Sequence, residues 1–131
     1  MPKGMTRLAL ALVALAFLAA PLTARAGEVL ASGKFTGASN HVTTGGVTVL
    51  KTDSGTLVIL EPDFSLDGAP DPKVGFGNDG SYDHKSQLAH LANNTGLQVY
   101  SVPDSVDAGS YNEVYIWCEK FSVPLGVAAL K

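Results

Sequence analysis

Residues 47–61 read VTVLKTDSGTLVILE, and this stretch decides the fold class. Two runs rich in β-branched and aliphatic residues, 47–51 and 56–61, flank residues 52–55, whose Asp, Ser and Gly are typical of turns. Two such runs around a short loop that contains glycine predict a β-hairpin. Pro62 follows and ends the second strand, because a proline nitrogen cannot donate to a sheet.

Strand-like runs recur on both sides of this hairpin, separated by turn signals rich in Gly, Asn, Asp and Pro. The further runs are residues 29–35, 97–102, 113–119 and 122–130. Residues 87–92 fit either a short strand or one helical turn, and residues 107–111 fit a short connection with one turn of helix. We therefore expect an all-β domain, an antiparallel β-sandwich or barrel-like fold of about seven or eight short strands.

The N-terminal residues have the pattern of a targeting segment. A basic start precedes an unbroken apolar run at 8–20, which is shorter than the roughly 20 residues needed to cross a bilayer. Residues 24–26 read ARA, a small-x-small cleavage pattern. The sequence thus predicts a signal peptide at 1–26 and a single exported domain at 27–131, periplasmic or extracellular, with no membrane span after signal cleavage.

The charge balance narrows the class of partner. The chain carries 9 basic and 12 acidic residues, and three of the basic ones lie in the predicted signal peptide. The exported domain then has 6 basic and 12 acidic residues, a net charge of −6, and contains no arginine. Such a surface repels phosphate backbones, so we expect no nucleic-acid partner.

The chain has one cysteine, Cys118. A lone thiol cannot form an internal disulfide, so it is a buried side chain, a link to another molecule or a reactive group. Side chains alternate along a strand, which puts Cys118 on one face with Val114 and Ile116. That face is apolar and should be the core side. A free cysteine buried there, with no cation nearby, would be inert.

The position of Cys118 also supports a second interpretation. The residue ends the apolar stripe, and polar residues follow it directly. It could therefore lie near the rim of the fold, partly open to solvent. Lys120 falls on the same side of the strand pattern, and a lysine beside a thiol lowers its pKa and favours the reactive thiolate.

The remaining ionisable residues give no strong motif. His41, His84 and His90 lack the spacing of metal-ligand pairs, so no metal site is predicted. The Pro- and Asp-rich segment 62–72 is expected to be an ordered surface loop, since aspartates beside Pro and Gly mostly form turns; calcium is the alternative there. No Gly-x-Ser-x-Gly nucleophile elbow occurs, which argues against a hydrolase.

Several segments together resemble a known family, the electron-transfer DM-thirteen domain. They are LANNTGLQVYSVP at 91–103, YNEVYIWCEKFSV at 111–123, GVAAL at 126–130, and in the first half GKF at 33–35 and HVTTG at 41–45. The resemblance covers residues 33–130, and its most specific part is Ile-Trp-Cys-x-x-Phe. One departure is Val74-Gly75-Phe76, where a bulkier strand resembling Val-Tyr-Leu is expected after the Pro-Asp element. This module occurs in secreted and surface proteins, including the Skeletor proteins, often beside DOMON domains.

The resemblance implies a small all-β domain with a redox role. It makes Cys118 the redox thiol or the ligand of a haem-like group, with Trp117, Tyr115, His41 and Asp71 as supporting residues. The expected partner is a redox protein or a surface ligand. The alternative is a binding or adhesion module in which Cys118 is structural and residues 62–72 form the recognition surface.

Overall fold

The computed structural model of the chain describes residues 27–131. The expected signal peptide lies outside these described residues. Within them the chain forms the strands β1 (Glu28–Gly37), β2 (Thr43–Thr44), β3 (Gly46–Thr52), β4 (Gly55–Leu60), β5 (Ser65–Leu66), β6 (Pro72–Asn78), β7 (Ser81–Asp83), β8 (Ala89–His90), β9 (Gln98–Val102), β10 (Glu113–Cys118) and β11 (Val123–Ala129), and the short 3-10 helices η1 (His84–Ser86) and η2 (Ala108–Ser110).

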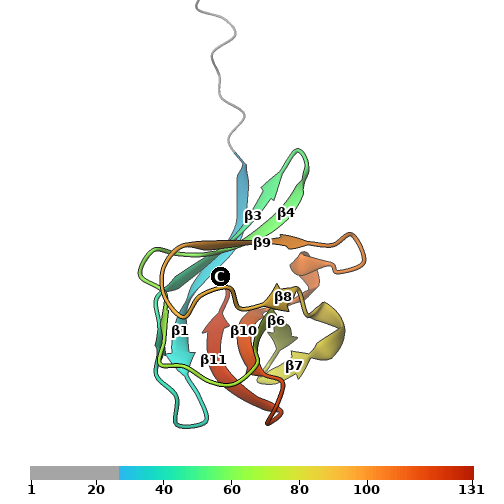
Figure 1. Cartoon of the computed structure of the whole chain (residues 1–131). Coiled ribbons are helices and arrows are strands. Elements are labelled where there is room, and N and C mark those ends of the chain that lie inside the picture. The colour runs from blue at the N-terminus through green and yellow to red at the C-terminus, as the bar shows by residue number, and fades with distance from the viewer. Residues whose placement is uncertain (1–26) are drawn as a thin grey trace, which may run out of the picture.

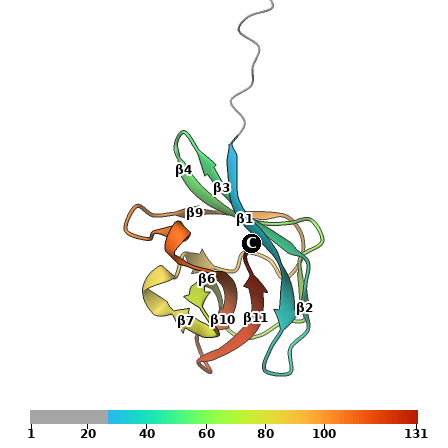
Figure 2. The ribbon, with the colours of Figure 1, turned by 180° about the vertical axis from the view of Figure 1, so that it is seen from behind.

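One curled antiparallel sheet contains most of these strands, in the order β7-β6-β10-β11-β1-β3-β4-β9 (Figure 1). β8 pairs with β6 beside this path, and β2 and β5 form a separate pair. The strand β1 joins the two halves, because residues 28–34 pair with β3 and residues 35–37 pair with β11. Figure 2 shows β1 descending to lie beside β11. The predicted all-β, antiparallel class is confirmed.

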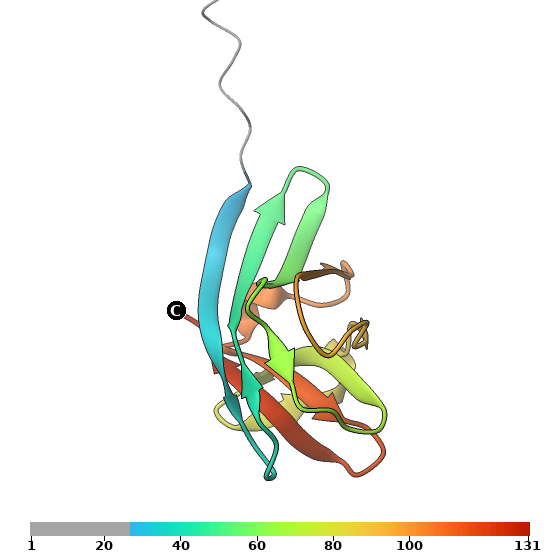
Figure 3. The same ribbon diagram turned by 60° about the vertical axis from the view of Figure 1, so that its left-hand side comes forward.

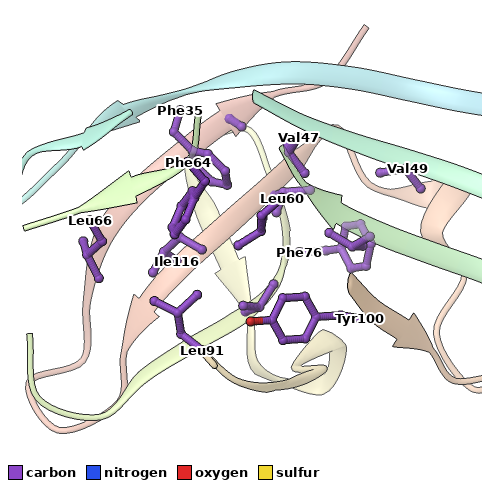
Figure 4. Packing of buried hydrophobic residues seen from close by; sticks show 14 of the residues in the cluster. Phe35, Val47, Val49, Leu60, Phe64, Leu66, Phe76, Leu91, Tyr100 and Ile116 are labelled. Atoms are coloured by element: carbon purple, nitrogen blue, oxygen red, sulfur yellow. The ribbon is translucent and has the colours of Figure 1, made fainter. Parts of the chain in front are cut away.

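The curl brings the inner sides of the two halves together over one core. Val47, Leu60 and Val58 from one half share a buried cluster with Phe76 and Ile116 from the other. Figure 3 shows the two halves from the side, and Figure 4 shows Leu60, Phe64, Phe76 and Ile116 converging between them. Strand alternation explains this directly, since β9 buries every second residue and exposes those between.

Two tight turns define the hairpins. In the β3–β4 hairpin Thr52 pairs with Gly55, so the loop has the two residues between them, as the sequence predicts. In the β6–β7 hairpin Asn78 pairs with Ser81 around Asp79 and Gly80, which have φ values of 51° and 86°. An Asp-Gly pair with positive φ at both positions suits the right-handed twist of the flanking strands.

Three expectations need correction in detail. Segment 62–72 is not only a surface loop, because it contains β5 and buries Phe64 and Leu66, which are 1% and 3% exposed. Their apolar side chains pull the middle of the segment into the core. Residues 87–92 form only the two-residue strand β8, and the predicted strand 113–119 ends at Cys118, with Glu119 in the following turn.

Candidate functional site: Cys118 and the aromatic face of β10

The strand β10 places Cys118 on the core side of the sheet. Val114, Ile116 and Cys118 are 0%, 0% and 1% exposed and belong to the central cluster. The alternation read from the sequence is therefore confirmed. The alternative position of the thiol at an open rim is wrong, because Cys118 is 1% exposed. Pro72, the first residue of β6, pairs with Cys118, and the residues just before Pro72 cover the sulfur.

The thiol has a specific partner in this closed position. The Cys118 S–H donates to the carbonyl oxygen of Pro70, with Sγ and O 3.2 Å apart. A thiol that donates carries its proton, so this contact belongs to the protonated form. Residues 70–72 thus lie against the sulfur as a short backbone cover, which Leu91 also holds through a hydrogen bond from its N–H to the Pro72 carbonyl at 2.8 Å.

Asp71 fixes the centre of this cover. Its φ of 52° is in the left-handed region, which disfavours an L residue, so other contacts hold it there. Its carbonyl oxygen accepts from the Glu119 N–H at 3.1 Å. Its carboxylate lies 3.2 Å from Lys73 Nζ and 3.3 Å from His90 Nδ1. The predicted supporting residue Asp71 therefore lies next to the thiol, through Pro70, rather than on a separate loop.

The opposite face of β10 carries aromatic rings. Trp117 stacks on Tyr82, with ring centroids 4.5 Å apart and planes 11° from parallel. The ring of His84 meets both edge-on, at 5.0 Å from Tyr82 and 5.3 Å from Trp117, and Tyr115 lies 5.5 Å from Tyr82. We call these four residues the aromatic face. Its outer members Trp117 and Tyr82 are partly exposed, whereas Tyr115 is 1% exposed.

Two glycines in β6 make room for these rings. A Cβ atom on Gly75 would lie 2.7 Å from Tyr82 Oη, and one on Gly77 would lie 2.5 Å from Tyr115 Cε1. At these distances a side chain on either residue would displace the ring it meets, so glycine at both positions lets the rings lie where they do. Within the segment 74–76, which departs from the family's pattern, Gly75 therefore leaves the space in which the Tyr82 ring lies.

The aromatic face has an unusual electrostatic environment. Burial, followed by the negative charges of Glu119 and Asp83, raises the pKa of the Tyr82 hydroxyl. Burial and the hydrogen bond to Glu113 raise the pKa of Tyr115 to about 12. Both phenols therefore stay protonated at neutral pH. Two buried polar atoms, Trp117 Nε1 and Glu119 Oε2, have no hydrogen-bond partner within residues 27–131.

The other predicted residues lie elsewhere or have other partners. His41 Nδ1 bonds to Asp67 Oδ1 at 2.8 Å and does not contact Cys118. Lys120 is exposed in the turn after β10, with Nζ 5.7 Å from the centroid of the Phe121 ring, so it is not the cation beside the thiol. Sequence reasoning missed Tyr82 and Glu119. The signal that could have found Tyr82 was the pair of glycines on one face of β6.

Cofactor ligands are not assembled around the thiol. Among the described residues no three His, Cys, Asp or Glu side chains form a group that could hold a metal ion. A haem iron would need the Cys118 sulfur, which is 1% exposed and already faces Pro70. A groove of about 380 Å³ between Leu30, Lys51 and Val106 has no Cys or His in its lining. The residues around Cys118 therefore do not fit haem.

Within residues 27–131 the structure contains no helix with the length and apolarity that a membrane crossing requires. Neither the comparison with curated proteins nor that with solved structures found a match. The profile of one protein family does match, over residues 34–130, and its description is electron transfer DM13. This match covers well over half of the chain and includes both Cys118 and the aromatic face. The chain belongs to the electron transfer DM13 family.

Proposed function

We propose that the chain is an exported electron-transfer module in which Cys118 is the redox group and a second redox protein is the partner. The observation that carries this proposal is the contact of Cys118 Sγ with Pro70 O beneath the Asp71 segment. The family description supports electron transfer in general. The composition of residues 1–26 supports export.

Burial decides how such a thiol could work. With Sγ covered by residues 70–72, no partner atom reaches the sulfur, so direct thiol exchange needs this cover to open. Oxidation of a thiol by one electron also releases its proton. The Pro70 carbonyl can accept the hydrogen bond but cannot keep the proton. We therefore propose a closed resting state, and an open state in which the thiol loses its proton to solvent and an electron to the partner.

The proposal is tested by the reactivity of the thiol in the folded protein. Cys118 is titrated with a small alkylating reagent across pH, in native buffer and in denaturant, and the modified fraction is read by mass spectrometry. A slow native reaction that depends on pH is expected. If the thiol reacts only in denaturant, and a Cys118→Ser variant passes electrons to a soluble acceptor as fast as the natural protein, the role of Cys118 is refuted.

A second function has a specific observation in its favour. Cys118 packs among Val114 and Ile116 as an ordinary core residue, which suits a binding module with a structural cysteine. In that case Cys118→Ser lowers stability and changes no interaction with a partner. Substitution of exposed residues in segment 62–72, such as Asp63→Ala, would then weaken the binding instead.

A further inference from the structure

The aromatic face packs apart from the central cluster, although Tyr115 within it is buried. Trp117, Tyr115 and Tyr82 lie on the side of the sheet away from the central cluster, and none of them belongs to it. Gly75 of β6 leaves the space in which the Tyr82 ring lies, since a Cβ there would meet only that ring. On an outer face, Trp117 could simply point into solvent. Instead it stacks closely on Tyr82, and this arrangement needs an explanation.

The unpartnered polar atoms are a second, independent observation. Trp117 Nε1 and Glu119 Oε2 are buried without hydrogen bonds among the described residues, on the two residues that flank Cys118. Buried polar groups nearly always find partners, and a redox role is one of the recognised explanations of an exception. The carboxylate of Glu119 also acts on the ring beside Trp117, because its charge contributes to the raised pKa of Tyr82.

We infer that Trp117, stacked on Tyr82 and served by Glu119, is a one-electron relay at the surface of this module. It rests on the proposed electron-transfer function and assigns the path by which an electron leaves or enters the domain. The oxidant is a metal-centred one-electron acceptor on the partner protein. This path is separate from the opening of the segment that covers Cys118, because the electron enters and leaves through the indole ring and not through the sulfur.

The chemistry of the relay is balanced in each step. The acceptor takes one electron from the indole π system, so the oxidation state of its metal falls by one. Trp117 becomes a radical cation. No covalent bond breaks in this step, and the indole keeps its Nε1–H, because the nitrogen is buried and no acceptor lies within hydrogen-bond reach among residues 27–131. One electron from a reduced metal centre on a second partner protein, which is oxidised by one unit, then restores the neutral ring. The parallel Tyr82 ring, with its centroid 4.5 Å away, spreads the positive charge. The Glu119 carboxylate, whose negative charge already acts on Tyr82, stabilises the radical cation.

Trp117 is the only tryptophan in the chain, so an indole signal reports this residue alone. The one-electron oxidation is measured by flash–quench with a photogenerated ruthenium(III) polypyridyl complex, and the potential by voltammetry against N-acetyltryptophanamide. All measurements use a Cys118→Ser background, which removes the thiol. We expect the oxidation equilibrium of Trp117 to be about tenfold more favourable than that of the free amide, or about 59 mV for a one-electron couple.

Three variants separate the relay from a structural role. Tyr82→Leu removes the stacked ring and Glu119→Gln removes the charge, and each should reverse at least half of that shift. Tyr82→Phe keeps the stack and should retain most of it. Tyr111→Leu is the matched control, because Tyr111 stacks on Phe76 rather than on Trp117, and it should leave the potential unchanged. Circular dichroism confirms that each variant is folded.

The outcomes distinguish the two proposals. If Trp117 has the potential of the free amide, or if folded Tyr82→Leu and Glu119→Gln both leave the potential unchanged, the relay is refuted. Should Tyr82→Leu fail to fold, the Glu119→Gln result decides alone. Because the thiol is absent throughout, a lowered potential supports the relay whatever alkylation shows for Cys118. If Cys118 reacts only in denaturant and Cys118→Ser still passes electrons to a soluble acceptor, only the role of the thiol is refuted.

Discussion

The carbonyl oxygen of Asp71 accepts a hydrogen bond from the backbone N–H of Glu119 at 3.1 Å. This bond ties the segment that covers the thiol to the residue that follows the thiol in the chain. It also connects the two sides of the sheet, because Cys118 faces the core while Glu119 acts on the aromatic face. The backbone at residues 70–71 and 118–119 therefore connects the covered thiol to the side of the sheet that carries the rings.

Removing the Asp71 charge should loosen this cover. Asp71→Asn removes the negative charge that faces Lys73 Nζ and the His90 ring, while the backbone bond to Glu119 remains. Because the carboxylate is 40% exposed, the stability cost should stay below about 1 kcal/mol. Native alkylation of Cys118 should become several-fold faster, which mass spectrometry over time would measure.

The matched control is Asp67→Asn, which removes a carboxylate from another histidine pair, that with His41. It should leave the alkylation rate unchanged. Equal acceleration in both variants would mean that global unfolding, rather than the Asp71 cover, exposes the sulfur.

The sulfur of Cys118 should contribute to stability by packing. Cys118→Ala removes one buried heavy atom and leaves the Pro70 carbonyl without its donor, so we expect a loss of about 1–2 kcal/mol. Cys118→Ser should cost less, because a hydroxyl can still donate to Pro70. Urea denaturation followed by Trp117 fluorescence measures both. An alanine variant as stable as the natural protein would show that the sulfur is not part of the core packing.

The fold followed from the sequence because its signals are local. The hairpin around residues 52–55 and the alternation in 113–119 depend only on neighbouring residues, and both are confirmed. The burial of Phe64 could not be predicted in the same way. Its segment has the composition of a loop, and only the pairing of β5 with β2, together with the edge-on contact of Phe64 with Phe35 at 5.4 Å, draws it inward.

The site was predictable only in part. Periodicity correctly placed Cys118 on the core side, but whether a rim is open depends on the neighbouring strand. Here Pro72 of β6 pairs with Cys118, and the residues before Pro72 cover the sulfur from solvent. The stack of Tyr82 on Trp117 joins residues 35 positions apart through β7, β6 and β10, and such long-range pairing leaves no local pattern.

The two glycines of β6 should differ in their tolerance of a side chain. A Cβ on Gly77 would lie 2.2 Å from the Ser81 backbone oxygen, which cannot move without breaking the β6–β7 hairpin. A Cβ on Gly75 meets only the Tyr82 side chain, which can rotate away. We expect Gly77→Ala to cost about 3 kcal/mol and Gly75→Ala about 1 kcal/mol.

Urea denaturation of the two glycine variants measures this difference. Gly75→Ala should also change the Trp117 fluorescence in the folded state, since its neighbour is displaced. Equal costs at the two positions would contradict the geometry of the hairpin.

Acid should lower the free energy of unfolding, in part by protonating Asp67. The Val42 N–H, followed by the hydrogen bond from His41, lowers the pKa of Asp67 below its usual value of 3.8. A carboxyl whose folded pKa is depressed binds its proton more weakly in the folded state. Its stabilisation is therefore complete above pH 3.8 and is lost as the pH falls through the folded pKa. Asp67→Asn should remove this component.

Thermal melting from pH 6 down to pH 2 tests the assignment. The natural protein should lose stability more steeply below pH 3.8 than Asp67→Asn, so the two melting curves converge in acid. Asp83 has a similarly lowered pKa, from the Tyr111 hydroxyl and then the Lys85 N–H, and its contribution should remain in the variant. If the two proteins keep a constant difference down to pH 2, the contacts of Asp67 with Val42 and His41 do not supply the acid-sensitive stability.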